Sequence, residues 1–148
     1  MGKIEAINIT NISEESTFYV NQAILEKGKG IVNDRYYGNC KEKKEQVTLI
    51  NLEEINNFNN QIKQNIDAKN FRRNIIVSGI NLNKIINKKI KINKVTLKVH
   101  EICQPCKYLQ DRLKIPGLIK MLVNKSGVRA EILTSGSLSV GDDIKILK

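Results

Sequence analysis

Two cysteines three positions apart are the residues of this chain best suited to chemistry, in the motif Cys103-Gln104-Pro105-Cys106. Protein thiolates have few uses, namely disulfide exchange, metal ligation, and nucleophilic or sulfur-carrying catalysis. A helical pattern follows the motif, so Cys106 is expected at or near a helix N-terminus, where the helix dipole stabilises a thiolate. We therefore expect Cys106 to be a nucleophile or metal ligand and Cys103 to be a buried small side chain.

Two other uses of these thiols stay open at this point. A thioredoxin-like motif normally opens a helix after the first strand of a βαβ unit, whereas this motif comes late and follows a predicted hairpin. A structural zinc site needs four ligands, which Cys40, His100, Cys103 and Cys106 could supply across a long sequence separation. Taken alone, Cys40 is expected to be buried, and His100, the only histidine, is expected to be a structural residue at a strand end.

The five arginines carry more information than the many lysines. The net charge is +10, and Lys, Asn and Ile dominate the composition, as AT-rich codon usage would produce. Solvated lysines explain this charge without a nucleic-acid partner, and no nucleic-acid-reading motif is present. In such a chain an arginine indicates a position where lysine would not serve, because the guanidinium fork binds phosphate or carboxylate at two points. Three of the five, Arg35, Arg72 and Arg73, fall in two short motifs.

Length and composition predict one globular domain over residues 1–148, with 41% hydrophobic and 27% charged residues. Three cysteines are too few, and an odd number, for a disulfide scaffold. No apolar run is long enough to span a bilayer, and the first residues lack the apolar stretch of a signal peptide. We expect a reduced, cytoplasmic protein, and the sequence leaves its oligomeric state open.

Alternation of apolar and polar residues predicts a mainly β chain. Strands are predicted over 3–10, 18–25, 46–50, 73–78, 89–93, 95–100, 128–133, 137–140 and 144–147. Helices are predicted over 51–60 with Asn51 as cap, over 106–113, and from Pro116 to Asn124, with one further helical turn over 81–86. The polar, glycine-punctuated segment 30–45 is predicted to be a long functional loop. Many short strands with few helices predict a closed or nearly closed mixed β-barrel decorated by helices.

Taken in order, these motifs resemble the MOSC domain family, named for the molybdenum cofactor sulfurase C-terminal domain. Residues 30–38, Gly-Ile-Val-Asn-Asp-Arg-Tyr-Tyr-Gly, resemble its G-x-x-G-D-R-H-x-G signature, and residues 72–80 resemble its R-x-N-[LI]-V-x-x-G-[IV] pattern, with Ile76 at the Val position. Cys106 lies where the family has its key cysteine, and residues 46–53 and 127–142 are also similar. The chain departs from the signature by Asn33 in place of Gly, which tolerates left-handed backbone, and by Tyr36 in place of His, so no acid–base role carries over to that position.

The resemblance implies a strand-rich MOSC barrel that binds the molybdenum cofactor, an anionic molybdopterin with a phosphate tail. Cys106 would be the metal ligand and the catalytic residue. The side chains implied in gripping the cofactor are Arg72 and Asn74, with Arg73, Arg35 and Asp34 as further candidates.

Three functions follow from these observations. The resemblance implies a molybdenum-dependent oxidoreductase that reduces N-hydroxylated substrates, using an external electron-donor protein because no flavin, haem or iron–sulfur motif is present. The alternative it implies is a non-catalytic carrier with a persulfide on Cys106, loaded by a sulfur donor such as a cysteine desulfurase. A zinc-stabilised or basic binding module is the third.

Overall fold

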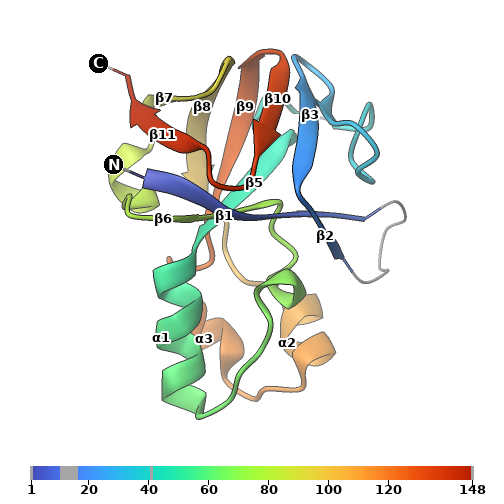
Figure 1. Cartoon of the computed structure of the whole chain (residues 1–148). Helices are drawn as coiled ribbons and strands as arrows, with labels where there is room; N and C mark the ends of the chain where they lie inside the picture. The colour runs from blue at the N-terminus through green and yellow to red at the C-terminus, as the bar shows by residue number, and fades with distance from the viewer. Residues whose placement is uncertain (1, 11–16, 41, 148) are drawn as a thin grey trace.

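A computed structural model of the protein describes residues 2–10, 17–40 and 42–147, which form mostly strands with three α-helices at one end (Figure 1). The strands are β1 (Gly2–Ile9), β2 (Phe18–Val20), β3 (Gln22–Glu26), β4 (Gly30–Ile31), β5 (Val47–Asn51), β6 (Ile75–Ser78), β7 (Lys89–Ile92), β8 (Val95–Ile102), β9 (Val128–Thr134), β10 (Gly136–Ser139) and β11 (Asp143–Ile146). The helices are α1 (Leu52–Ile62), α2 (Lys107–Leu113) and α3 (Leu118–Leu122).

Seven of the strands close into a ring, in the order β11-β7-β8-β9-β5-β6-β1. The ring closes where β1 pairs with β11, with Gly2 opposite Ile144 and Lys3 opposite Asp143. Strands β5 and β6 run parallel, while the other neighbours are antiparallel. A parallel pair needs a crossover connection, and α1 lies in the connection between these two strands. The prediction of a closed mixed β-barrel is confirmed.

Apolar side chains that alternate along the strands fill the barrel. Ile4, Leu49, Ile75 and Leu97 are all fully buried there. In β1 a register shift between Ile4 and Ala6 changes the phase of the alternation. Ile4 and Ile7 therefore both enter the core, although strict alternation puts them on opposite faces.

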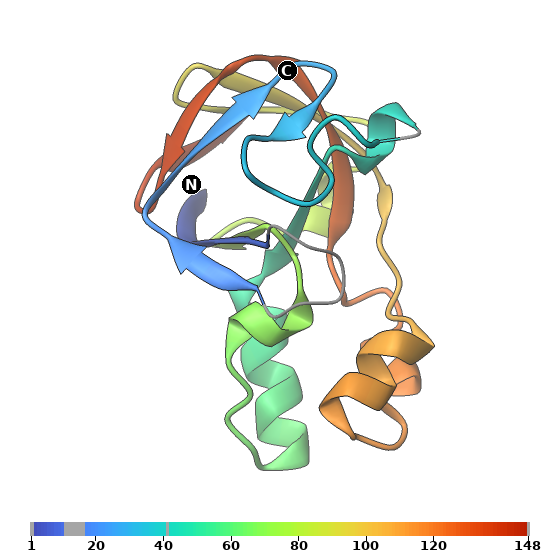
Figure 2. The ribbon, with the colours of Figure 1, turned by 90° about the vertical axis from the view of Figure 1, so that its right-hand side faces the viewer.

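A second core lies outside the barrel, where the three helices pack against one end of it (Figure 1, Figure 2). Phe58 of α1 meets Phe71 with ring centres 5.8 Å apart, edge to face. Ile50 and Ile76 point out of the barrel into the same cluster, which also includes Leu109 of α2. This layer fixes α2, and with it the cysteine motif, against the barrel.

Several boundaries differ from the sequence predictions by one or two residues, and three differences have a structural cause. The strand predicted over 18–25 breaks at Asn21, so β2 extends the barrel sheet while β3 joins a smaller sheet with β4 and β10. Within the predicted loop over 30–45, β4 and a 3₁₀ turn at Lys43–Glu45 interrupt the turns. The helix predicted from Pro116 begins at Leu118, because Gly117 adopts a left-handed conformation (φ 79°) that ends the turn before it.

Candidate functional site

Four of the five arginines and two of the three cysteines line one pocket of about 420 Å³. It lies where the 103–106 loop and α2 meet the barrel and the turn before β6. Among the residues that the structure describes, neither a carboxylate nor a lysine lines it. Its walls are Arg35, Tyr36, Phe71, Arg72, Arg73, Cys103, Gln104, Cys106, Tyr108, Leu109 and Arg129.

The two cysteines differ in exposure. Cys106 is the residue that precedes α2, with an extended backbone (φ −124°, ψ 166°), and its side chain is exposed. Cys103 is only 4% exposed, and its backbone N–H donates to the carbonyl of Gly127 at 2.8 Å. Both thiols are free, so the pocket contains one accessible and one sheltered thiol, as the sequence predicted.

Arg72 reaches the pocket through an unusual backbone conformation. It follows a 3₁₀ turn (Ala68–Phe71) and is left-handed, with φ 61°, which costs a side chain other than glycine about 1–2 kcal/mol. Its side chain is buried, and its guanidinium carbon lies 5.7 Å from the centre of the Tyr108 ring. Strain of this kind is typical of positions where a side chain must be presented in one direction.

The Arg73 guanidinium is held by hydrogen bonds to two neighbouring segments. Its Nε donates to the Ser126 carbonyl at 2.8 Å, and its Nη2 donates to Ser126 Oγ at 2.9 Å and to the Gln104 carbonyl at 3.5 Å. Burial lowers the pKa of its guanidinium, which Arg129 lowers further, whereas Cys103 and Cys106 raise it. An arginine stays protonated at neutral pH despite such a shift, so Arg73 is a fixed cation beside both thiols.

Asp34 and Arg35 act at different places. The buried Asp34 carboxylate accepts the Thr10 backbone N–H at 3.1 Å, so it holds the loop and is not part of the pocket wall. Burial raises the pKa of Asp34, against the lowering effect of its backbone hydrogen bonds. Arg35 does line the pocket, with its guanidinium carbon 4.7 Å from the centre of the Tyr36 ring. Asn33 adopts the left-handed conformation (φ 74°) that the signature glycine would supply.

Asn74 is bonded across the barrel wall and does not line the pocket. Its Oδ1 accepts the Thr48 backbone N–H at 3.0 Å and the Thr48 hydroxyl at 3.1 Å, and its Nδ2 donates to the Asn8 carbonyl at 3.3 Å. These bonds join β5 and β1 directly beside Arg73. Asn74 therefore holds the start of β6 against β5 and β1, and it supports the pocket from outside.

Arg129 is the charged residue of the pocket that the sequence prediction of the site did not include. It lies in β9, opposite Thr48 of β5 and Glu101 of β8, so only closure of the barrel brings it to the cysteines. The available signal was its residue type, because it is one of only five arginines. Arg112, the fifth, lies on α2 with Nη1 3.4 Å from the Tyr108 hydroxyl and is not in the pocket wall.

The four residues considered for zinc do not come together. The Cys40 thiol lies 3.2 Å from the Tyr36 carbonyl and 3.5 Å from the Glu45 carbonyl, and is half-buried rather than buried as expected. His100 Nε2 lies 2.9 Å from the Glu131 carboxylate. Within the described ranges no group of three or more metal-ligating side chains forms.

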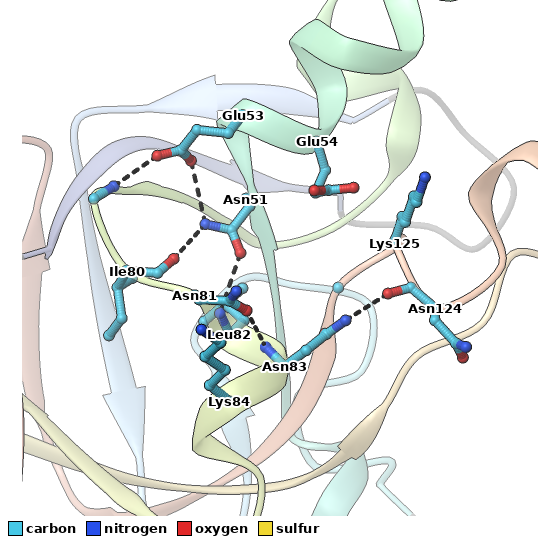
Figure 3. Close-up of a pocket in the computed structure, with 12 residues that line it drawn as sticks. Asn51, Glu53, Glu54, Ile80, Asn81, Leu82, Asn83, Lys84, Asn124 and Lys125 are labelled. Carbon is cyan, nitrogen blue, oxygen red and sulfur yellow. Dashed lines mark hydrogen bonds between the residues drawn. The ribbon is translucent and has the colours of Figure 1, made fainter.

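A second, larger pocket of about 660 Å³ is lined by other residues (Figure 3). Its amide side chains bond their own surroundings: Asn51 Nδ2 donates to the Ile80 carbonyl and Asn83 Nδ2 to the Asn124 carbonyl, each at 2.6 Å (Figure 3). Its described lining holds no thiol and no arginine. We therefore take the smaller pocket as the candidate site, because it is the one that contains the thiols and the arginines.

The described helices include none with the length and apolar character needed to cross a membrane.

Comparison with known proteins adds a family and a set of folds. A family model for the MOSC domain matches residues 34–145. The structure of the YuaD protein from Bacillus subtilis is similar with a TM-score of 0.85 and 19% identity, covering 99% of this chain and 96% of that one. YiiM from Geobacillus stearothermophilus gives a TM-score of 0.81 with 16% identity, covering 100% of this chain and 76% of that one. For YiiM from Escherichia coli the TM-score is 0.76 with 12% identity, covering 99% and 70%. No curated protein matches the chain.

Proposed function

The chain belongs to the MOSC domain family, and we propose that its arginine-lined pocket binds the molybdenum cofactor and supports reduction of N-hydroxylated substrates. The observation that carries the proposal is the gathering of four arginines around an exposed thiol, with no acidic side chain among the described residues of the wall. The MOSC domain is associated with this cofactor in general, and the pocket is where this chain concentrates the chemistry that such a ligand needs.

The residues present fit the group. The cofactor is an anion with a phosphate, and guanidinium groups are the side chains that bind phosphate oxygens at two points. A thiolate is a soft ligand suited to a sulfur-bound metal, and Cys106 is the exposed thiol of the pocket. The volume of about 420 Å³ lies in the range of small-molecule sites.

Each wall residue then has a part in binding. Arg73, fixed by Ser126, supplies a cation that needs no reorganisation when an anion arrives. Arg35 and Arg72 extend the positive wall, and Arg129 adds charge from β9. The bound cofactor supplies the two-electron chemistry, while the protein contributes orientation, charge and the Cys106 ligand. Electrons would come from an external donor protein, and three free thiols suit a reducing compartment such as the cytoplasm.

Molybdenum and pterin content tests this proposal. The chain is purified from a host that makes the cofactor, alongside Cys106→Ser and the control Cys40→Ser, which changes a thiol outside the pocket. We expect near-stoichiometric molybdenum in the wild type and in Cys40→Ser, none in Cys106→Ser, and turnover of an N-hydroxylated amidine with a chemical electron donor. Equal molybdenum in Cys106→Ser would contradict the assigned ligand, and zinc in place of molybdenum would contradict the function.

A sulfur carrier is the second candidate, favoured by the same exposed thiol. In that function Cys106 would hold a persulfide delivered by a sulfur donor such as a cysteine desulfurase. Cyanide-releasable sulfur on the purified protein, lost in Cys106→Ser but kept in Cys40→Ser, would support it. Absence of such sulfur from a molybdenum-loaded protein would favour the reductase.

A further inference from the structure

We infer that the pocket has a sulfurtransferase activity in which Cys106 takes sulfane sulfur from a small anionic donor, such as thiosulfate, and Cys103 releases it as hydrosulfide. The inference builds on the second candidate function, the persulfide on Cys106, and adds a substrate class and a second catalytic thiol. It requires no molybdenum cofactor.

The charge of the pocket selects the donor. Thiosulfate is a dianion, and four guanidinium groups line the pocket without a carboxylate among the described wall residues. Arginine binds oxyanions at two points, so the sulfonate oxygens have partners on several sides of the thiol. A protein that donates sulfur is not needed, because the arginines of the pocket wall can bind a small anionic sulfur donor directly.

The first step takes place at the accessible thiol. The Cys106 thiolate attacks the outer sulfur of thiosulfate, a Cys106 S–S bond forms, and the bond between the two thiosulfate sulfurs breaks. The electron pair of that bond leaves with sulfite, so thiolate plus thiosulfate give a persulfide anion plus sulfite with charge conserved. The arginines stabilise the departing sulfite, whose negative charge lies on oxygens that match their fork.

The second step uses the sheltered thiol. The Cys103 thiol gives its proton to the departing sulfur and attacks the Cys106 Sγ of the persulfide. A Cys103–Cys106 disulfide forms and hydrosulfide leaves, again with charge conserved. An external dithiol reduces this disulfide to complete the cycle, as in thiol–disulfide exchange generally.

The local structure supports the pairing of these two thiols. Both line the same pocket, and two residues separate them, the spacing of dithiol redox motifs. Three residue steps span at most about 11 Å, so the length of this loop allows the two Cα atoms to come within the roughly 4.4–6.8 Å that a disulfide needs. The Arg73 contact to the Gln104 carbonyl places a cation against the same loop.

Cys40 provides the matched control. It is half-buried, it does not line the pocket, and its thiol lies against backbone carbonyls. Burial raises the pKa of the Cys40 thiol, and Glu45 and Asp34 raise it further. It therefore lacks both the arginine wall and a neighbouring thiol.

The test uses the full chain from a host unable to make molybdenum cofactor, reduced, freed of reductant and mixed with thiosulfate. In the wild type and in Cys40→Ser we expect sulfite and sulfide in equal amounts and a protein mass lower by two hydrogens. Cys103→Ala should release sulfite, give background sulfide and gain the mass of one sulfur. Cys106→Ser should release neither product.

Sulfide from Cys103→Ala at the wild-type yield, or a wild type that keeps the added sulfur, would overturn the role of Cys103. No sulfite from the wild type would overturn the donor class. Should Cys103→Ala fold poorly, peptide mapping of thiosulfate-treated wild type decides, because the account requires a Cys103–Cys106 disulfide. Failure of these assays leaves the molybdenum measurement unaffected, since the protein used carries no cofactor.

Discussion

The two neighbouring pockets of this protein differ in size and in chemistry. The described lining of the larger one includes no thiol and no arginine, whereas the smaller one has both. The larger, of about 660 Å³, is lined by amides and mixed charges, and its asparagines bond the backbone around them. The smaller, of about 420 Å³, holds four arginines and two thiols. We therefore place the candidate site by the concentration of a rare residue type, arginine, and not by cavity volume.

The two pockets have no lining residue in common, but hydrogen bonds join their walls. Gln104 of the smaller pocket bonds Asn124 of the larger through both side chains and backbone, with Nε2 donating to Asn124 Oδ1 at 2.6 Å and Asn124 N–H donating to Oε1 at 2.8 Å. Ser126, two residues further along the chain, accepts two hydrogen bonds from Arg73. Segment 124–127 therefore shapes both pockets at once.

The largest effect is expected at Gly127, which lies in segment 124–127 and lines the larger pocket. A Cβ there would lie 2.1 Å from the Leu49 carbonyl oxygen, and φ is +99°. Gly127→Ala should therefore lower the free energy of unfolding by about 3 kcal/mol or more, since overlap with backbone adds to strain. Gly141→Ala is the control, because φ is +95° there but nothing lies within 4 Å of the new Cβ. If urea denaturation gave both variants the same free energy of unfolding, the close packing of Gly127 against the Leu49 carbonyl would be refuted.

Arg73→Lys should come next in size. Lysine cannot make both bonds to Ser126 and still present a planar fork, so we expect molybdenum content to fall about tenfold. Two control variants should keep the wild-type molybdenum content. Arg112→Lys changes an arginine outside the smaller pocket, and Glu54→Gln changes a residue of the larger pocket. Elemental mass spectrometry of the purified proteins measures this. An equal loss of molybdenum in Arg73→Lys and Glu54→Gln would show that cofactor binding does not depend specifically on the smaller pocket.

Arg129→Ala should have a smaller effect, on the electrostatics around Cys106 alone. Two unit charges about 4 Å apart in water interact by about 1 kcal/mol, which corresponds to about a fivefold change in rate, and we take this as the upper limit for Arg129. We expect the ratio of Cys106 alkylation by anionic iodoacetate to that by neutral iodoacetamide to fall by up to this factor. Arg112→Ala should leave the ratio unchanged. An unchanged ratio in Arg129→Ala would remove this residue from the site.

The smallest effect is expected at Tyr19, whose hydroxyl donates to Asp67 beside the turn that leads to Arg72. Burial and this bond raise the pKa of Tyr19 to about 12. The stabilisation is therefore present below pH 10, the ordinary value, and is lost as pH rises toward about 12. The same bond lowers the pKa of Asp67, so its contribution is also lost as pH falls through that lowered pKa.

Tyr19→Phe lacks this bond, and both groups are partly exposed, so we expect less than about 1 kcal/mol between the variant and the wild type. Thermal denaturation across pH should show the gap narrowing at both extremes. A gap that stays constant from neutral pH to pH 12 would show that the phenol proton does not stabilise the turn.

The sequence predicted the barrel well because its strands are short and regular. Apolar alternation along Lys89–Ile92 and Val95–Ile102 fills the interior, and pattern alone identifies it. The sequence pattern did not predict the break at Asn21, where β2 and β3 separate into different sheets. This break depends on pairing partners far along the chain, which a local pattern does not contain.

The candidate site was predicted in part. Cys106, Arg35, Arg72 and Arg73 lie in recognisable motifs and do meet at one pocket. Asn74 shares a motif with Arg72, but a motif cannot show that its amide bonds other strands. Arg129 belongs to an ordinary strand pattern, and only the register of β9 against its neighbours brings it to the thiols.

Anomalous diffraction at the molybdenum absorption edge, from crystals of protein purified from a cofactor-producing host, locates the metal relative to both pockets. We expect one anomalous peak beside Cys106 Sγ, within the pocket formed by Arg35, Arg72, Arg73 and Arg129. A molybdenum peak in the larger pocket, or one remote from Cys106, would contradict the assignment of this pocket as the cofactor site.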